Sequence, residues 1–541
     1  MGNTDVLIAG AGPIGLTAAI ELRRRGVRCR VVDPLLESPQ YAKAVGVQPR
    51  TLELFEGMGV LRRILDAAIQ MRGQLVYVNG TEVGRIDLSL PPDVPYQFIG
   101  IPQYATERIL RERLYELGVV IERGMRLASF VQDDESVVAT LAGNFEETVR
   151  AKYVVGCDGA HSTVRKTLGL TFEGAAFEEE YMLGDVEVDW TQPRGYSVRS
   201  MHQSDGVTDD LLVCIPLPGR NRYRVSMLVP EELASTPAGA TDEVVHGFEG
   251  ARKPELRHIQ AVLDRLSPEP TRAANLRWSS VFRISHRIVN AYGRGRVFVA
   301  GDAAHIHPPT GAQGMNTGIQ DAHNLAWKLA LAVHGEAAPG LLASYDAERR
   351  PVGEEVVGRT VRSAREGIGA DSTDVGYVMR REAQLLIDYA GSPIIGATGG
   401  AVVDDPAPRA GMRAPDARGL TRDAVSFPLR LFDLFDRVNH TMLIHAGVAT
   451  TAQDLTEIER VAAAAAGIAH GRLETYVLAE EGAEVGGTVL PLIRDSAGEF
   501  ARMYSATGIA TFVVRPDGYL GFAQRSLTVV NLHDYLKRTF R

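Results

Sequence analysis

The chain has little cysteine, and what it has is widely scattered. Cys29, Cys157 and Cys214 are its three cysteines, and none of them shows the close spacing of metal ligands. A disulfide framework is therefore excluded as the basis of the fold, and a reducing compartment is indicated. His305 and His307 lack a third ligand at matching spacing, so we expect local hydrogen bonding there and no metal site.

Long apolar runs and a surplus of positive charge are also missing. No stretch reaches the length of a membrane span, and the first expected strand begins at Asp5, which leaves no room for a signal peptide. The formal net charge of −9 and the pI near 5.9 argue against nucleic acid binding, which needs a basic face. The sequence therefore predicts a cytoplasmic protein that binds neither membrane nor nucleic acid.

Glycine, in contrast, is plentiful, with 55 residues in a chain of 541. The apolar share of 45% and the charged share of 23% are ordinary for a globular protein. A chain of this length exceeds one compact core, so two or three domains are expected. The glycine surplus suits loops that lie against a cofactor.

The N-terminal stretch "DVLIAGAGPIGLTAAIELRRRGVRCRVVDP" predicts a strand, a helix and a second strand. After the first strand, Gly10, Gly12 and Gly15 fill a G-x-G-x-x-G pattern, which allows the backbone to approach a pyrophosphate at the helix N-terminus. Asp33 ends the second strand about 20 residues on, where a carboxylate can bond a ribose hydroxyl. The pattern predicts a dinucleotide site without distinguishing NAD from FAD.

A second pattern, "GDAAHIHPPTGAQGMNTGIQDAHNLAWKL", follows a buried strand expected over residues 296–300. It places Asp302 at a strand end and a loop from Gly311 to Gly318 at the start of a long helix. A carboxylate there can accept hydrogen bonds from a polyol, and the helix N-terminus presents amides to negative charge on a flavin ring. We therefore predict that this loop cradles a flavin.

A third pattern, Asp158-Gly159, follows an expected strand in "AKYVVGCDGAHSTVRKTLGL". On its own, an Asp-Gly after a strand is most often a turn. Arg165 and Lys166 follow it, and they could serve the 2′-phosphate of NADPH or form ordinary surface pairs. The choice between NADH and NADPH stays open.

In this order and at this spacing, the three patterns resemble the FAD-dependent aromatic hydroxylases. These are class A flavoprotein monooxygenases of the p-hydroxybenzoate hydroxylase fold, and the likeness to the phenol and polyketide hydroxylase branch covers nearly the whole chain. It implies that NADPH or NADH reduces FAD and that O₂ forms a C4a-hydroperoxide, which oxygenates a phenolic or polyketide-type ring. A flavin reductase or dehydrogenase without oxygen transfer, and a non-catalytic aromatic-binding flavoprotein, are the alternatives.

The resemblance also implies which residues contact the cofactor. The implied contacts are Gly10, Gly12, Gly15 and Asp33 at the ADP half, Gln103 and Asp302 at the ribityl-pyrophosphate region, Asp158 and Gly159 between FAD and the nicotinamide site, and Gly311, Gly314, Met315 and Asn316 along the isoalloxazine. Lys43 stands where the family usually has arginine, and it keeps the charge but not the bidentate fork.

No catalytic base is identified by the sequence. Pro308 and Pro309 are expected to shape the substrate face, because the family's equivalent prolines lie over the flavin ring. Five further residues could assist a substrate hydroxyl, although ordinary packing or surface roles are the simpler interpretation of each. These are Tyr181, Tyr196, Tyr223, His202 and Arg287.

The expected architecture is an α/β fold in four segments. Residues 1–175 form the first part of a Rossmann-like FAD-binding domain, and residues 176–274 form an inserted antiparallel β-sheet domain that binds the substrate. Residues 275–400 complete the FAD domain with long helices. Residues 401–541 resemble a linker and a thioredoxin-like domain that lacks cysteine, for which a structural role or the support of a homodimer is expected.

Overall fold

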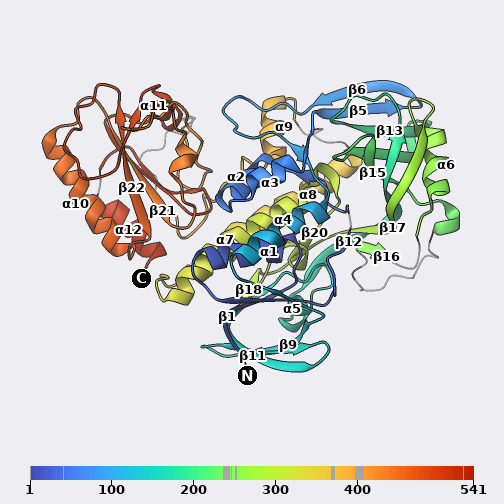
Figure 1. Ribbon diagram of the computed structural model, residues 1–541, viewed down its shortest axis with the longest axis horizontal. Coiled ribbons are helices and arrows are strands. Elements are labelled where there is room, and N and C mark those ends of the chain that lie inside the picture. Colours follow the sequence, from blue (N-terminus) through green and yellow to red (C-terminus); the bar gives the residue numbers. More distant parts are fainter. Residues whose placement is uncertain are drawn as a thin grey trace.

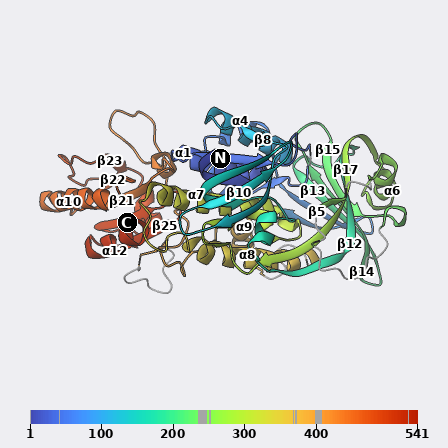
Figure 2. The same ribbon diagram turned by 90° about the horizontal axis from the view of Figure 1, so that it is seen from below.

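Three main sheets with their helices build the molecule in one row (Figures 1 and 2). The computed structural model describes residues 2–40, 42–234, 244, 247–249, 253–366, 369, 372–396, 407–527 and 529–541. A parallel α/β domain lies in the centre, a nine-stranded sheet at one end and a five-stranded domain at the other. None of the helices in these ranges is long and apolar enough to cross a membrane.

The central sheet has the strand order β18-β19-β11-β1-β2-β8, with β9 and β10 attached beside β11. Strand β1 pairs in parallel with β2 and β11, and β11 pairs in parallel with β19. The expected strand–helix–strand unit is present. The strands are β1 (Gly2–Ala9), β2 (Cys29–Asp33), β8 (Ile121–Arg123), β9 (Arg126–Gln132), β10 (Val137–Ala142), β11 (Glu146–Gly156), β18 (Gly293–Arg294) and β19 (Val297–Val299).

Helices cover this sheet because its strands are apolar on both faces. They include α1 and α7, which pack on each other directly behind the glycine pattern. The helices of this part are α1 (Pro13–Arg24), α2 (Pro49–Gly57), α3 (Leu61–Asp66), α4 (Gln103–Glu116), α5 (Thr163–Thr167), α7 (Gly314–His334), α8 (Ser344–Glu366) and α9 (Val375–Glu382), and a small sheet joins β3 (Gly46–Val47), β7 (Ile99–Gly100) and β4 (Ile69–Gln70).

The nine-stranded sheet is wider than the range 176–274 from which an inserted sheet was expected. It gains β5 and β6 from before the insertion, because β5 pairs in parallel with β13. Helix α6 (Leu256–Leu266) covers its outer face (Figure 1). The strands are β5 (Gly73–Val78), β6 (Thr81–Asp87), β12 (Phe172–Asp189), β13 (Tyr196–Ser204), β14 (Val207–Pro216), β15 (Arg222–Leu228), β16 (Gly247–Glu249), β17 (Arg272–Val289) and β20 (His305–Ile306).

The C-terminal sheet has the order β23-β22-β21-β24-β25. Strands β21, β22 and β23 are mutually parallel, and β24 and β25 form the expected hairpin around Pro516-Asp517-Gly518. The expected domain boundary at residue 400 lies outside the described residues. The elements are β21 (His440–Ala446), β22 (Leu473–Glu480), β23 (Leu492–Asp495), β24 (Ile509–Val514), β25 (Leu520–Gln524), α10 (Ala452–Ile468), α11 (Glu499–Tyr504) and α12 (Val529–Thr539).

A buried ion cluster joins the C-terminal hairpin to helices α7 and α8. The Arg515 guanidinium donates to both oxygens of Glu348 at 2.6 and 2.8 Å, and Lys328 Nζ lies 2.7 Å from Glu348 Oε2. Asp517 accepts from Asn324 at 3.1 Å and pairs with Arg515. These side chains are all buried, so the hairpin is docked through charged groups that water does not reach.

Candidate active site

The glycine pattern forms the tight turn between β1 and α1. Gly10 has φ +100°, and a Cβ atom on it would lie 2.3 Å from the carbonyl oxygen of Cys157. A Cβ on Gly15 would lie 2.0 Å from the carbonyl oxygen of Gly10. In contrast, a Cβ on Gly12 would meet no protein atom within 4 Å, and no side chain caps helix α1 at this residue. Gly10 and Gly15 thus allow close packing, while Gly12 leaves an open approach to the helix N-terminus.

Asp33 ends β2 beside this turn, as expected, but its carboxylate already has protein partners. It accepts from the backbone N–H of Ala11 at 2.8 Å and of Leu35 at 2.9 Å. Arg123 Nη1 lies 3.1 Å from Asp33 Oδ1, the oxygen that also accepts from Leu35. Asp33 therefore fixes the glycine turn against β2 and β8, in addition to lying where a ribose contact was expected.

Gln103 and Asp302 meet through the segment that carries Lys43. Gln103, the first residue of α4, accepts from the backbone N–H of Ala44 at 3.2 Å and donates to Glu107 at 2.8 Å. Lys43 Nζ lies 3.2 Å from Asp302 Oδ2, and both side chains are about one-third exposed, at 30% and 36%. The structure therefore brings three predicted contact residues from distant parts of the sequence together.

Burial raises the pKa of Glu107 to about 7. The folded state then keeps this proton over a pH range in which the unfolded chain has lost it, so the free energy of unfolding falls as pH rises from about 4.3 to about 7, by up to about 3 kcal/mol. We expect Glu107→Gln to remove this decline in flavin-free protein, measured as urea midpoints at pH 5 and pH 8. Glu112→Gln, a change on the same helix at a partly exposed side chain, should keep the decline in stability between pH 5 and pH 8. A decline that persists in Glu107→Gln would show that it does not come from the proton on Glu107.

The loop after β19 is held by Asp321 of α7. Its carboxylate accepts from the backbone N–H of Gly301 at 3.2 Å and contacts His305 Nε2 at 2.8 Å, while Arg349 Nε donates to it at 2.8 Å. Gly301 (φ +60°) and Gly318 both lie against Ile14, and a Cβ on either glycine would come within 2.8 Å of that side chain. The loop is thus clamped between α1 and α7.

Helix α7 begins at Gly314, which corrects the expectation of a loop that reaches Gly318. The Asn316 side chain accepts from the backbone N–H of Gln48 at 2.9 Å and donates to the Gly46 carbonyl at 3.0 Å. Asn316 therefore ties the start of α7 to the 43–48 segment. No side chain caps the N-terminus of α7, and Gly311 turns with φ +70° just before it. The amides of Gly314, Met315 and Asn316 are the first of this helix, which makes its start a site for negative charge.

His307 and the two prolines follow the same loop. His307 Nδ1 donates to the carbonyl of Pro308 at 2.9 Å, and burial lowers the pKa of His307 to about 4, so the ring is neutral at pH 7. Pro308 is buried and Pro309 is exposed. Among the described residues, no group of three or more His, Cys, Asp or Glu side chains could hold a metal ion.

The Asp158-Gly159 pair turns the chain into helix α5. The Asp158 carboxylate accepts from Ser162 Oγ at 2.5 Å and from the backbone N–H of Thr163 at 2.7 Å. Arg165 is 2% exposed, donates to the backbone carbonyls of Ala303 and Ala160, and stacks on Phe172 at 3.9 Å. Arg165 is therefore used inside the fold and does not offer a surface for a 2′-phosphate, whereas Lys166 is exposed.

Of the five side chains considered near a substrate hydroxyl, only Tyr181 lies on the face of the nine-stranded sheet turned away from α6, beside Phe282. Tyr196 and Tyr223 pack in the cluster under α6. His202 contacts Asp209 at 2.6 Å on the surface, and Arg287 donates to the carbonyl of Phe172. The two faces of the sheet cannot be told apart from the sequence alone, because the difference depends on which face α6 covers.

Two arginines that the sequence reasoning did not select, Arg224 and Arg199, lie on the same face as Tyr181. A signal for Arg224 was present in "RYRVSML", residues 222–228, where charged and apolar residues alternate. Such alternation places the arginines of a strand on the face opposite its apolar core residues. Both faces of this strand are largely buried, so its arginines lie in a place where charged side chains are uncommon.

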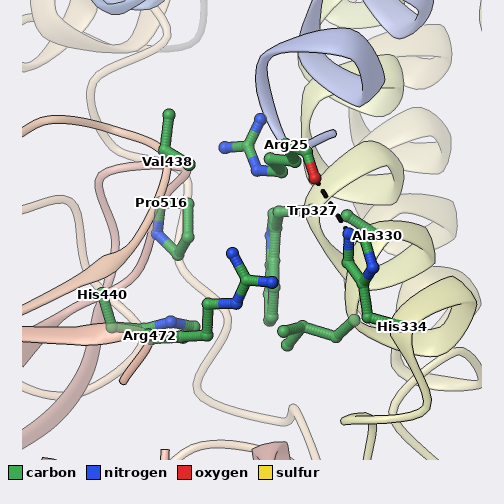
Figure 3. Close-up of a pocket in the computed structure, with 9 residues that line it drawn as sticks. Arg25, Trp327, Ala330, His334, Val438, His440, Arg472 and Pro516 are labelled. Atoms are coloured by element: carbon green, nitrogen blue, oxygen red, sulfur yellow. Dashed lines mark hydrogen bonds between the residues drawn. The ribbon is translucent and has the colours of Figure 1, made fainter. Parts of the chain in front are cut away.

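A separate pocket lies between α7 and the C-terminal domain (Figure 3). Its volume of about 20 Å³ has room for about one water molecule. His334 Nε2 donates to the backbone carbonyl of Arg25 across one wall at 2.9 Å. The lining residues are Arg25, Trp327, Ala330, Leu331, His334, Val438, His440, Arg472 and Pro516. It lies away from the glycine turn and the start of α7, and it is too small for a cofactor.

Comparison with known proteins identifies the group to which this arrangement belongs. The family described as "FAD binding domain" matches residues 3–360. Rifampicin monooxygenase of Streptomyces venezuelae is 39% identical over 390 residues, which cover 71% of this chain and 75% of that protein. Pentachlorophenol 4-monooxygenase of Sphingobium chlorophenolicum is 33% identical over 482 residues, or 85% and 82% of the two chains.

A solved structure agrees along the whole chain. The crystal structure of a ternary complex of aklavinone-11 hydroxylase with FAD and aklavinone superimposes with a TM-score of 0.77, at 25% identity and 99% coverage of both chains. The matched range 3–360 contains the glycine turn, the Gln103 segment and the loop before α7. The chain therefore belongs to the family of FAD-dependent aromatic hydroxylases that share this FAD binding domain.

Proposed function

We propose that the chain hydroxylates an electron-rich aromatic ring of phenolic or polyketide type, with NADPH or NADH as electron donor and O₂ as oxygen source. The observation that carries the proposal is the meeting of two uncapped helix N-termini, those of α1 and α7, at the ends of parallel strands. Ligands of α/β proteins bind at this edge of the sheet. The rifampicin and pentachlorophenol monooxygenases among the relatives support an aromatic substrate.

The residues at this edge fit FAD. The open side of Gly12 and the start of α1 suit the pyrophosphate, with Gly10 and Gly15 beside it and Asp33 at the ribose of the ADP half. Gln103, Lys43 and Asp302 offer polar groups to the ribityl chain. The remaining proposed contacts, around the ring and toward the nicotinamide, are Asp158, Gly159, Gly311, Gly314, Met315 and Asn316. Bound FAD supplies the redox chemistry and the activation of oxygen.

The protein's own part is binding, orientation and exclusion of water. The start of α7 stabilises negative charge next to it, and neutral His307 holds the carbonyl of Pro308 in place. Pro308 and Pro309 bound the substrate side without offering a proton. The nine-stranded sheet covers that side, which keeps the reacting groups away from bulk water.

The C-terminal domain is proposed to be thioredoxin-like. The parallel pair β21 and β22 next to the antiparallel hairpin β24–β25 supports this assignment. It contains no cysteine, so it does not exchange disulfides. We propose a structural role for it, including support of a homodimer, which sedimentation velocity of the holoenzyme would test by a mass of two chains.

The test of the function couples three measurements. The holoenzyme should oxidise NADPH or NADH, consume O₂ and form a hydroxylated product in equal amounts with an accepted phenol or polycyclic quinol. Under anaerobic conditions, an accepted aromatic should speed flavin bleaching by the nucleotide. Oxidation of the nucleotide without any oxygenated product, over a panel of both substrate kinds, would favour the reductase. No bleaching at all would favour a non-catalytic aromatic-binding flavoprotein.

A further inference from the structure

Gln384, two residues after the end of helix α9, has a backbone conformation that most side chains disfavour. Its φ of +59° lies in the left-handed region, which is costly for a residue with a long side chain. The residue is nevertheless 2% exposed, so its side chain is held inside the protein. Strain of this kind persists only where the surrounding structure imposes it, and it is concentrated at functional sites. The contacts of this side chain therefore show what the strained position achieves.

The Gln384 amide makes three hydrogen bonds at the start of helix α7. Its Nε2 donates to Gln313 Oε1 at 2.7 Å and to Thr317 Oγ1 at 2.9 Å. Its Oε1 accepts from Gln320 Nε2 at 2.5 Å. Gln313 is the N-cap residue of α7, and the other two partners lie in the first two turns of that helix. All three partners are buried, so a single amide holds the start of α7 from within the protein.

Gln313 extends this hold to the loop before α7. Its Nε2 donates to the carbonyl of Gly311 at 3.0 Å and to Glu382 Oε2 at 3.1 Å. From the other side of the loop, Gln48 Nε2 donates to the same carbonyl at 2.7 Å. Gly311 and Ala312 both have left-handed backbones, with φ +70° and +54°, so the loop is strained at Ala312 as well. Side-chain amides on two sides thus fix the loop in a conformation that it would not adopt alone.

Helix α9 gives Gln384 a firm support. Arg380 donates twice to the carboxylate of Asp93, at 2.8 and 2.9 Å. Glu382 Oε1 accepts from Arg359 Nη1 of α8 at 2.6 Å. Apolar residues of α9 also share one buried cluster with apolar residues of the segment 90–98. The end of α9 is therefore anchored at several points, and Gln384 transfers its position to α7.

The position of the start of α7 matters because its first amides lie where the flavin ring is proposed to bind. No side chain caps this helix, so the amides of Gly314, Met315 and Asn316 are available to negative charge. A bound flavin gains negative charge on reduction. The amides therefore favour reduced over oxidised FAD, to an extent that depends on their distance and direction. A helix start that was free to shift would lose part of this preference.

We propose that Gln384 is a positioning residue that sets the reduction potential of bound FAD by fixing the start of α7. This inference rests on the proposed function, in which the flavin ring lies at that helix start. Gln384 acts through Gln313 and Thr317 and is assigned no contact with flavin or substrate. Glycine would adopt the same backbone conformation without strain. The strained glutamine is therefore explained by what its side chain holds.

The first test measures the reduction potential of two variants as holoenzymes. Gln384→Gly removes the amide and the backbone strain together, whereas Gln384→Ala removes the amide and keeps a left-handed non-glycine residue, as at Ala312. We expect both to have a midpoint potential about 30 mV lower than the parent, which corresponds to about tenfold weaker binding of reduced relative to oxidised FAD. The potential is measured by equilibration with a reference dye under anaerobic conditions, without an aromatic ligand.

Ala424→Gly is the matched control. Ala424 has φ +66° and is exposed in the C-terminal domain, so this variant loses the same kind of strain at a distance from α7 and should keep the parental potential. A parental potential in both Gln384 variants would overturn the proposal. So would a shift in Gln384→Gly alone, because that result would trace the effect to the backbone and not to the amide.

Hydrogen exchange of the flavin-free protein provides a readout without the cofactor. The amides of residues 317–321 donate within the first turns of α7, beginning with the bond from Thr317 N–H to the carbonyl of Gln313 at 2.9 Å. We expect them to exchange at least about threefold faster in Gln384→Gly and Gln384→Ala than in the parent or in Ala424→Gly. Unchanged exchange in both Gln384 variants would show that the amide does not hold the helix start, and would overturn the proposal.

These outcomes are independent of turnover. Lowered potentials and faster exchange in a flavoprotein that oxygenates no aromatic would leave the inference intact and refute the hydroxylase proposal. Coupled hydroxylation by a parent enzyme whose Gln384 variants keep its potential would do the reverse.

Discussion

Replacement of Gly12 by valine is expected to give a folded protein that no longer retains FAD. A Cβ at Gly12 meets no protein atom within 4 Å, and the backbone has φ −74°, which any residue adopts. The added methyl groups would occupy only the space in front of the α1 N-terminus, where the pyrophosphate is proposed to lie. We expect a dissociation constant at least about a hundredfold higher, equivalent to about 3 kcal/mol.

The measurement is the flavin content of the purified variant, followed by titration with FAD and quenching of flavin fluorescence. Gly467→Val is the matched control, since Gly467 in α10 also has nothing within 4 Å of its Cβ direction. Gly10→Ala provides the contrast, because the added Cβ would collide with the backbone of Cys157 and Gly10 has a positive φ. We therefore expect a lower yield of folded protein for Gly10→Ala. If Gly12→Val were purified with a full complement of FAD, the pyrophosphate would have to lie elsewhere.

Replacement of Glu348 by leucine is expected to destabilise the protein by about 3–5 kcal/mol, the cost of leaving buried charges unpaired. Glu348 is fully buried and accepts from Arg515, Lys328, Asn324 and Ser392. Without it, two cations would share the single carboxylate of Asp517. The urea midpoint of unfolding, with the tryptophan fluorescence of Trp327 beside the cluster, would report the loss.

The same replacement, Glu348→Leu, should also change how the free energy of unfolding depends on pH in the acid range. Arg515 and Lys328 hold the pKa of Glu348 well below its ordinary value, although burial alone would raise it. The stabilisation that Glu348 provides is therefore complete above the pKa of an unfolded glutamate, about 4.3, and is lost as the pH falls below that value. The free energy of unfolding of Glu348→Leu should consequently fall less on acidification than that of the parent protein. Glu354→Leu, which breaks a surface pair with Arg350 on the same helix, should cost less than about 1 kcal/mol. Equal effects of the two variants would show that the cluster does not support the hairpin.

The local patterns predicted the elements that position the cofactor. The glycine turn, the strand before Asp302, the helix after the loop and the hairpin around Pro516-Asp517-Gly518 all depend on neighbours within a few residues, which the sequence displays directly. Even there, the start of α7 was misplaced by four residues, from Gly318 to Gly314, because Gly318 is required for contact with Ile14 of α1 and not for the loop.

Contacts between distant segments could not be predicted in this way. In "STVRKTLGL" the sequence suggests that Arg165 is a surface cation, but the carbonyls of Ala303 and Ala160 and the ring of Phe172 make it an internal residue. Arg224 is the converse case, since the register places it opposite Asp185 but Arg222 takes that carboxylate. The hairpin turn was evident, but its docking through Arg515 onto Glu348 and through Asp517 onto Asn324 joins residues more than 150 positions apart.

The parallel pairing of β1 with β11 and of β11 with β19 governs how the chain assembles as it is made. Gly2 lies beside Val149, and Val154 beside Val297, so each of these two pairings closes a loop of well over a hundred residues. Synthesis proceeds at about 5–20 residues per second, and β1 therefore waits for its neighbour β11, and β11 for β19, with apolar edges uncovered. Such pairing is slow and exposed to aggregation. Recombinant yield of this enzyme should accordingly depend on chaperone supply and low growth temperature more than on the stability of the finished fold.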